Sequence, residues 1–414
     1  MNRGVGRFIL PAMRIRCLSL MLFVPAVVAA QAPSSALAQA SAVTQQVWQT
    51  QDSGTTAGLR GIFSVDGKVA WASGTEGTVL KTVDGGAHWQ KCAVPDAATD
   101  GATLDFRGLH AWDADTAIVM ASGPGEKSRL YKTTDGCKTW NLILKNKDKH
   151  GFWDTLYFDR GRWSWLLGDP VNGEFSLFAS NDAGKSWTRQ HNKGLRVKAG
   201  TQGAFAASNS SLVMAGGNLA FGSGGSAGAL LHSRSELVEI CLDDCSPQEM
   251  NLDGRKDKWY QQKIPLGENT DSSGVFSLAY RDSHRPDTEV FFKGGGGTNI
   301  TNWQFIAVGG DYTKPNESAG TAAWSDDSGR TWTASATPPH GYRSSVQWSE
   351  ALKLWITAGA NGSDISRDDG RTWQPLDDGN WNALSLPFVV GPKGRIARLN
   401  PAAISATTAA AGEK

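Results

Sequence analysis

The sequence has almost no net charge and lacks the patterns that mark nucleic-acid or metal binding. Its 414 residues carry 41 Lys and Arg against 40 Asp and Glu, a formal net charge of +1. No Arg/Lys-rich stretch interleaved with aromatic residues is present, which excludes the usual nucleic-acid surface. Seven histidines and five cysteines are scattered along the chain, without metal-ligand spacing. We therefore expect no nucleic-acid partner, no metal and no cofactor.

Long apolar stretches are also missing, except at the N-terminus. The absence of long runs with a 3.6-residue apolar period predicts few helices. Several arginines precede the single apolar run, Cys17–Ala30, which is too short and Pro-interrupted for a good membrane span. Small-residue cleavage sites follow it near Ala30 and Ala40. We predict a signal peptide over residues 1–40, with Met13 as an alternative start, and a periplasmic or secreted protein.

Five short segments share the pattern S/T-x-D-x-G-x-x-W, with Cys137 replacing the glycine in the second copy. We call them the corner segments. Each follows an apolar or alternating run, which is typical of a strand. They are Thr82–Trp89, Thr133–Trp140, Ser180–Trp187, Ser325–Trp332 and Ser366–Trp373.

The residue types of a corner segment indicate a tight turn between two strands. The Asp carboxylate can accept hydrogen bonds from turn amides, and Gly adopts backbone conformations that other residues resist. The Trp is large enough to fill the gap between neighbouring sheets. We assign these residues structural roles: Asp84, Asp135, Asp182, Asp327 and Asp368 in the turns, and Trp89, Trp140, Trp187, Trp332 and Trp373 between sheets.

The corner segments resemble Asp-box (BNR) repeats, which occur in sialidase-type and related β-propellers. This resemblance implies an all-β propeller, in which repeated four-stranded units build a common core. It implies no activity, because such propellers include both enzymes and binding proteins.

Seven tryptophans mark outer strands if Trp48 and Trp259 are counted with the five of the corner segments. Two longer intervals between them require insertions, at about 234–258 and 281–299. About three strands remain after Trp373, and the strand of Trp48 has no blade of its own. Joining them would complete a last blade and close the ring without free edges.

The sequence thus predicts an all-β, seven-bladed β-propeller of four-stranded antiparallel blades over residues 41–403. Its N-terminal strand joins the C-terminal blade, and residues 404–414 form a disordered tail. Six and eight blades are the alternatives.

Four cysteines remain after removal of the signal peptide, an even number in an oxidising compartment. Cys241 and Cys245, in the first insertion, are candidates for a local disulfide. Cys92 and Cys137 are candidates for a bridge between blades one and two.

Arginines recur at the starts of predicted innermost strands, which line the central channel of a propeller. Arg60, Arg107 and Arg343 begin three of these strands, and Trp153 or Asp154 takes the same place in a fourth. A ring of guanidinium groups would bind a carboxylate, a phosphate or an acidic peptide. Alternatively, each arginine pairs with an acidic residue such as Asp105. The innermost strand of the fourth blade is predicted over Gly203–Ser208.

A narrower resemblance is to the photosystem II stability/assembly factor-like proteins, which are secreted single propellers with blades like Leu59–Trp89. It covers nearly all of the mature chain. It implies a chaperone-like scaffold that binds an assembling membrane protein through an arginine-bearing face. Arg60, Arg107 and Arg343 are the residues that could form this face here.

We therefore predict a secreted, monomeric binding or assembly scaffold with a protein partner. The main alternative is a sialidase-like or other glycoside hydrolase acting on a carbohydrate, with Asp105, Asp154 and Asp169 as candidate carboxylates. No Arg-Ile-Pro segment of the sialidase type precedes the first corner segment. A third possibility is an envelope adhesion or structural protein that uses the insertions.

Overall fold

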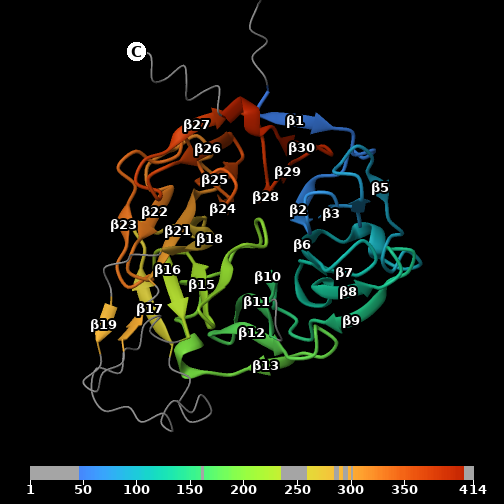
Figure 1. Cartoon of the computed structure of the whole chain (residues 1–414). Coiled ribbons are helices and arrows are strands. Elements are labelled where there is room, and N and C mark those ends of the chain that lie inside the picture. The colour runs from blue at the N-terminus through green and yellow to red at the C-terminus, as the bar shows by residue number, and fades with distance from the viewer. Residues whose placement is uncertain are drawn as a thin grey trace, which may run out of the picture. The chain divides into compact units, whose positions relative to one another are not determined.

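The computed structural model describes residues 46–159, 163–234, 259–283, 289–291, 297–299 and 302–404. This part of the chain forms seven four-stranded antiparallel sheets arranged in a ring (Figure 1). The predicted all-β, seven-bladed propeller is confirmed. The predicted signal peptide, residues 405–414 of the predicted tail, and nearly all of the first insertion lie outside the described residues.

The first four blades each use four consecutive strands. Blade one contains β2 (Leu59–Ser64), β3 (Ala70–Gly74), β4 (Val79–Thr82) and β5 (Gln90–Lys91). Blade two contains β6 (Phe106–Ala111), β7 (Ala117–Ala121), β8 (Arg129–Thr133) and β9 (Asn141–Lys145). Blade three contains β10 (Trp153–Phe158), β11 (Ser164–Val171), β12 (Glu174–Ser180) and β13 (Thr188–Gln190). Blade four contains β14 (Leu212–Ala215), β15 (Asn218–Ser223), β16 (Leu230–Ser233) and β17 (Tyr260–Lys263).

Blade five contains β18 (Ser273–Ser283), β21 (Asn302–Asp311), β22 (Ala322–Ser325) and β23 (Thr333–Ala334). The hairpin of β19 (Glu289–Phe291) and β20 (Gly297–Asn299) lies between β18 and β21 in the chain, within the second predicted insertion. Blade six contains β24 (Ser345–Ser349), β25 (Leu354–Gly359), β26 (Gly362–Ser366) and β27 (Gln374–Asp377). Blade seven contains β28 (Ala383–Ser385), β29 (Phe388–Val390), β30 (Ile396–Leu399) and β1 (Trp48–Gln51).

Helical structure is confined to short turns in the described part of the chain. Three 3-10 turns are η1 (Gly101–Thr103), η2 (Gly125–Lys127) and η3 (Lys193–Leu195), and residues 401–404 form one further helical turn. Among the residues that the structure describes, no helix is both long and apolar enough to cross a membrane.

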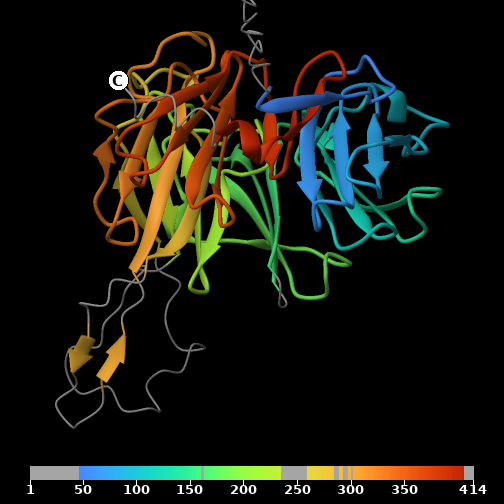
Figure 2. The same ribbon diagram turned by 45° about the horizontal axis from the view of Figure 1, so that its top comes forward.

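The two ends of the chain close the ring in blade seven. Strand β1, blue in Figure 2, pairs antiparallel with β30 of the red blade seven. In this pairing Trp48 lies opposite Leu399. The Trp48 indole also donates a hydrogen bond of 2.9 Å to Ser363 Oγ in blade six. The predicted closure is therefore confirmed, and it protects an edge that would otherwise be exposed.

The hydrophobic core consists of seven clusters, one between each pair of neighbouring blades. The middle strands supply most of it because both of their faces are covered; all five residues of β7, for example, are buried. Each of the seven marker tryptophans packs in the cluster between its own blade and the preceding one. Burial of these large rings joins the blades laterally.

The corner segments connect the third and fourth strands of blades one, two, three, five and six, and they share one hydrogen-bond pattern. In the second copy, Asp135 accepts hydrogen bonds from the backbone N–H and hydroxyl of Thr139, at 3.0 and 2.6 Å. These bonds lower the pKa of Asp135 to about 2 because they favour the ionised carboxylate. Thr133 Oγ1 accepts from the Cys137 amide at 3.1 Å and donates to Asp135. The segment is thus a self-contained turn.

Cys137 has a positive φ of 68°, a backbone conformation that favours the glycine found in the other corner segments. It forms a disulfide with Cys92. Cys92 directly follows β5 of blade one. The predicted bridge between blades one and two is therefore confirmed. Cys241 and Cys245 lie outside the described residues.

Candidate binding site at the channel mouth

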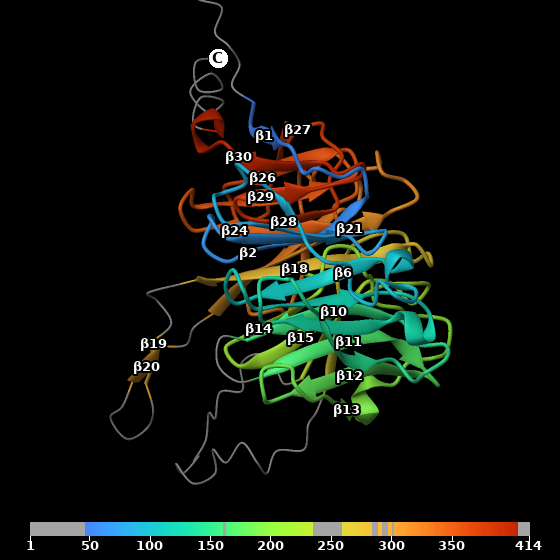
Figure 3. The same ribbon diagram turned by 90° about the vertical axis from the view of Figure 1, so that its right-hand side faces the viewer.

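The innermost strands of four blades carry a β-bulge at the same place, and this positions the candidate site. The strands β2, β6, β10 and β18 each shift register around one residue near their start. A bulge bends the strand and re-aims the side chain of the extra residue. The bulged residues are Arg60, Arg107, Asp154 and Phe276. Neighbouring innermost strands contact one another around the channel. Figure 3, which views the ring from its side, shows β2, β6 and β10 following one another.

Two of the predicted arginines share one carboxylate at the channel mouth. Arg107 Nε donates a hydrogen bond of 2.9 Å to Asp105 Oδ2, and Arg60 Nε lies 3.9 Å from Asp105 Oδ1. Within the described part of the chain, Arg60 Nε has no hydrogen-bond partner. Burial lowers the pKa of Arg60, an effect that Asp105 opposes and Arg107 reinforces. Two guanidinium groups facing one carboxylate leave an excess of one positive charge.

Asp154 joins this group as a buried carboxyl. Asp154 is only 2% exposed, and its Oδ2 has no hydrogen-bond partner among the described residues. Burial, and then the charge of Asp169, raise the pKa of Asp154 well above its usual value. Burial also raises the pKa of Asp169 to about 6, although its Oδ1 accepts a 3.0 Å hydrogen bond from the Ala204 amide.

Arg343 does not belong to the channel mouth, which corrects the sequence prediction. It is fully buried, and its Nε and Nη2 lie 2.6 and 2.5 Å from Asp364 Oδ2. Nη1 donates to Asn361 Oδ1 at 2.5 Å, and Nη2 lies 2.9 Å from His340 Nδ1. The guanidinium is therefore saturated inside the protein.

The physical reason is a register difference of one residue. The Arg343 amide donates to Gly309 O of the preceding blade, just as the Leu59 amide donates to Gly391 O. Arg343 thus matches Leu59 rather than Arg60, and successive residues of an extended chain point to opposite sides. The sequence prediction aligned Arg343 of Tyr342–Ser344 with Arg60 of Leu59–Gly61. This alignment placed Arg343 one residue too far along its blade.

The predicted innermost strand over Gly203–Ser208 is also wrong. Strand β14 begins only at Leu212, and residues 203–211, which we call the channel segment, enter the centre of the ring (Figure 1). The stretch A-A-S-N-S-S lacks the large apolar residues that other innermost strands bury, and this was the signal available in the sequence.

The channel segment bonds to four blades other than its own. Ala206 O accepts from Arg107 Nη1 of blade two at 3.2 Å, and Asn209 Oδ1 accepts from the Leu156 amide of blade three at 2.7 Å. Ser210 O accepts from the Leu278 amide of blade five at 2.8 Å. Ser208 Oγ donates to a backbone carbonyl directly before β24 of blade six, at 2.5 Å. The channel segment is therefore held by blades on different sides of the ring.

An aromatic group borders the same mouth. The Phe205 ring of the channel segment stacks on Phe276, with centroids 4.0 Å apart. Tyr342 and Tyr312 pack edge-on against Phe276, with centroids at 4.8 and 6.1 Å. Tyr312 is 53% exposed, whereas Phe276 and Tyr342 are buried. Of these three rings, Tyr312 is the one that a ligand could contact.

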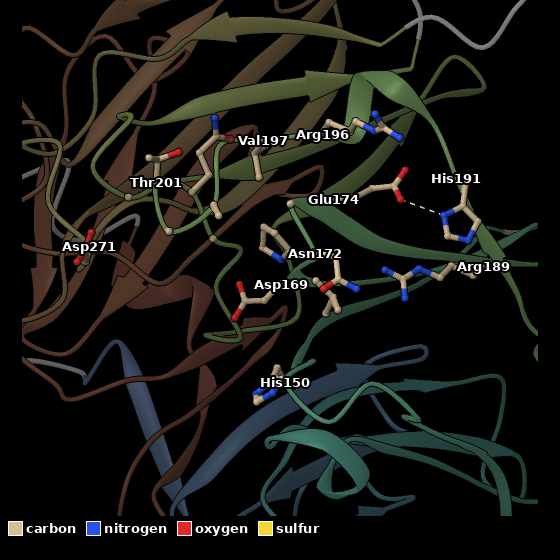
Figure 4. Close-up of a pocket in the computed structure, with 18 residues that line it drawn as sticks. His150, Asp169, Asn172, Glu174, Arg189, His191, Arg196, Val197, Thr201 and Asp271 are labelled. Atoms are coloured by element: carbon tan, nitrogen blue, oxygen red, sulfur yellow. Dashed lines mark hydrogen bonds and ion pairs between the residues drawn. The ribbon is translucent and has the colours of Figure 1, made fainter.

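A cavity of about 1110 Å³ reaches Gly203, the first residue of the channel segment, and its lining residues are shown in Figure 4. The turn between β11 and β12 forms one wall, and the chain between η3 and the channel segment forms another. Asp169 lines the cavity, whereas Asp154 is not among the lining residues. On one side of it, His191 Nδ1 lies 2.9 Å from Glu174 Oε2 (Figure 4). Sequence reasoning missed this cavity because loops from separate blades build it.

No metal cluster is found among the described residues, where no three potential ligand side chains lie together. The corner-segment carboxylates are engaged by their own turns and are not part of the candidate site.

The chain resembles solved structures of propeller proteins. No protein-family model matches the sequence, and no curated protein matches it. A structure described as YCF48 bound to D1 peptide is 17% identical, with a TM-score of 0.51 over 86% of this chain and 97% of that chain. YCF48 from Cyanidioschyzon merolae is 19% identical, with a TM-score of 0.51 over 86% and 99% of the two chains. The chain shares their fold.

Proposed function

We propose that this propeller is a binding or assembly scaffold that engages a protein partner through its channel mouth. The observation that carries the proposal is the Arg60–Arg107 pair, in which two guanidinium groups face the single carboxylate of Asp105. Such a pair can bind a carboxylate of a partner segment through charge-assisted hydrogen bonds. The likeness to YCF48, one structure of which holds a D1 peptide, supports a peptide segment as the ligand.

We also propose that the protein is monomeric and works in the periplasm or outside the cell. The signal-peptide pattern at the N-terminus favours export. The Cys92–Cys137 disulfide agrees with an oxidising compartment. We further propose that the corner segments are Asp-box repeats.

The test is a cross-linked pull-down from the native envelope fraction. The mature protein is compared with an Arg60→Ala/Arg107→Ala double variant and with Arg367→Ala, which removes an exposed arginine on the outer part of blade six. We expect a protein that the wild type and Arg367→Ala retain and the double variant loses, with all three equally folded. Equal recovery by all three, or no captured protein, would contradict the channel-mouth role.

A second candidate function is glycoside hydrolysis, and one observation favours it. Asp169 lines the cavity with a pKa raised to about 6, which suits a general acid, and Asp154 lies close by. Against it, none of the described residues that line the cavity is Trp, Tyr or Phe, the side chains that usually stack on sugar rings. Turnover of a glycoside panel that disappears in Asp169→Asn would establish this function.

The third possibility, adhesion through the insertions, rests mainly on residues outside the described part of the chain.

A further inference from the structure

We infer that Asp105 restricts the channel-mouth site to ligands with one negative charge, a lone carboxylate, and disfavours doubly charged groups such as phosphate. Carboxylates and phosphates both bind guanidinium groups, so the arginines alone do not choose between them. The inference rests on the proposed function, because it concerns the same site. It adds the chemical class of the ligand and the residue that sets this choice.

Arg60 is the arginine with free donors at this site. None of its guanidinium nitrogens forms a hydrogen bond within the described part of the chain, and its side chain is 36% exposed. By contrast, Arg107 donates from Nε to Asp105 and from Nη1 to Ala206 O. A guanidinium group has five N–H donors in one plane and can hold a carboxylate by two parallel hydrogen bonds. Arg60 is therefore the residue that contacts the ligand, and Arg107 holds the site together.

Asp105 is a negative charge fixed beside Arg60. Its Oδ2 accepts a 2.9 Å hydrogen bond from Arg107 Nε. Its Oδ1 is buried without a hydrogen-bond partner in the described chain and lies 3.9 Å from Arg60 Nε. A hydrogen bond between two charged groups is stronger than a neutral one, so Asp105 stays in place when a ligand arrives. The ligand therefore meets two positive charges and one negative charge.

The neighbouring charged groups do not restore a second excess positive charge. Asp105 and Arg107 are the charged side chains that most affect the pKa of Arg60. Arg343 is fully buried in an ion pair of its own. Asp154 is held mainly neutral because burial raises its pKa, and any ionised fraction would add negative charge. The Arg60–Arg107 pair and these neighbours thus carry at most one excess positive charge.

One excess positive charge is matched best by a ligand with one negative charge. Electrostatic attraction grows in proportion to the charge of the ligand, whereas the cost of removing the ligand from water grows with the square of that charge. A phosphate monoester carries about −1.5 to −2 at pH 7, which exceeds the charge of the site. A carboxylate carries a single charge and fits the guanidinium plane, so it is the favoured ligand.

The experiment is an NMR titration of the mature protein labelled with ¹⁵N-arginine. It follows the Nε–Hε signal of Arg60, which is identified by its loss in Arg60→Ala. The probes are acetyl-Gly-Glu-Gly-amide with one negative charge, acetyl-Gly-phosphoserine-Gly-amide with about two at pH 7.5, and the neutral acetyl-Gly-Gln-Gly-amide. Acetyl-Gly-Gly-Gly with a free carboxyl group tests a chain terminus as the source of the carboxylate.

The variant is Asp105→Asn, which removes the charge but keeps an oxygen that can accept from Arg107. The matched control is Asp66→Asn. Asp66 is exposed in the turn after β2, at the opposite end of this strand from Arg60, and its Oδ1 accepts from two turn amides. The control therefore makes the same change in net charge, with an acceptor oxygen kept, away from the site. Melting curves check that each variant is folded.

We expect the wild type and Asp66→Asn to bind the Glu peptide more tightly than the phosphoserine peptide, and not to bind the Gln peptide. Asp105→Asn should bind both charged peptides more tightly. Its gain for the phosphoserine peptide should be about the square of its gain for the Glu peptide, about tenfold against about threefold. If Asp105 served only to hold Arg107, the gain would not depend on ligand charge. Tighter binding of the free-carboxyl peptide than of the Glu peptide indicates a chain terminus, and the reverse indicates a side chain.

Tighter binding of the phosphoserine peptide by the wild type, or equal gains for both peptides in Asp105→Asn, would overturn the inference. So would the absence of any shift of the Arg60 signal with either carboxylate peptide. If Asp105→Asn does not fold, the preference of the wild type between the Glu and phosphoserine peptides decides.

These outcomes are distinguishable from those of the pull-down. A partner lost in the Arg60→Ala/Arg107→Ala variant, together with a phosphoserine preference, would support the proposed function and refute only the inference. A carboxylate preference without any captured protein would support the role of Asp105 and refute the protein partner.

Discussion

Arg343 and Asp364 form an ion pair in which neither side chain is exposed to solvent, with Nη2 and Oδ2 2.5 Å apart. His340 and Asn361 complete the network around the guanidinium. Burial lowers the pKa of Arg343, and Asp364 opposes that effect. The pair joins the start of blade six to its third strand, and the first prediction concerns its contribution to stability.

Replacement of Arg343 by Met should lower the free energy of unfolding by up to about 3–5 kcal/mol, because it removes the guanidinium that neutralises the buried Asp364 carboxylate. His340, whose Nδ1 lies 2.7 Å from Asp364 Oδ1, then remains beside that carboxylate. Urea denaturation measures this difference. Arg343→Met/Asp364→Leu should recover much of the loss, since no charge then remains unpaired. A single variant as stable as the wild type would show that Asp364 finds another partner.

The tryptophans of the corner segments should differ in their contributions. Trp373 is 2% exposed and lies between blades five and six, whereas Trp140 is only partly buried. Trp373→Ala should cost about 3–5 kcal/mol, the usual range for emptying a buried aromatic site, and Trp140→Ala should cost less. Paired chemical denaturation curves of the two variants test this order, and the reverse order would refute the assigned packing.

The disulfide should stabilise the contact between blades one and two. It joins residues 45 positions apart, and removing a native bridge typically costs about 2–5 kcal/mol. The Cys92→Ser/Cys137→Ser variant should therefore melt at a lower temperature than the wild type. Adding a reductant should lower the melting temperature of the wild type but leave that of the double variant nearly unchanged. An equal response of both would assign the reductant effect to other cysteines.

His232 should make the fold sensitive to acid. It is fully buried against Phe221, and burial lowers its pKa to about 3. The folded state therefore binds fewer protons than the unfolded state between about pH 6.5 and 3, and stability falls as the pH falls through that range. The wild type should lose up to about 1.4 kcal/mol per pH unit relative to His232→Phe. The free energy of unfolding of the wild type and of His232→Phe is measured at pH 7, 5 and 4. Equal pH dependence of the two proteins would exclude His232 as the source of acid sensitivity.

Sequence patterns were sufficient for the fold because its defining features are local and repeated. A D-x-G turn between strands followed by Trp is visible in consecutive letters, and the strand of Trp48 had no other place to pair. The places of Cys92 and Cys137 in neighbouring blades made their bridge a candidate, which the structure then contains. These predictions needed only short-range periodicity and the closure of sheet edges.

The site was less predictable because it depends on register and on loops. A one-residue shift separates Arg60, on a bulge, from Arg343, in the core, and the letters around them look alike. The cavity around Asp169 is built from segments far apart in the chain. The channel segment looked like a strand because its length fitted the repeat, although its small polar residues favour a loop.

The channel segment should change how the unfolding of one blade affects the stability of the others. In most repeat proteins each unit contacts only its neighbours, so damage in one unit weakens mainly the adjacent ones. Here Ala206, Ser208 and Asn209 connect blades two, six and three through a loop that belongs to blade four. Local unfolding of blade four would therefore remove contacts of blades on the opposite side of the ring. Opposite blades should unfold together rather than one after another around the ring.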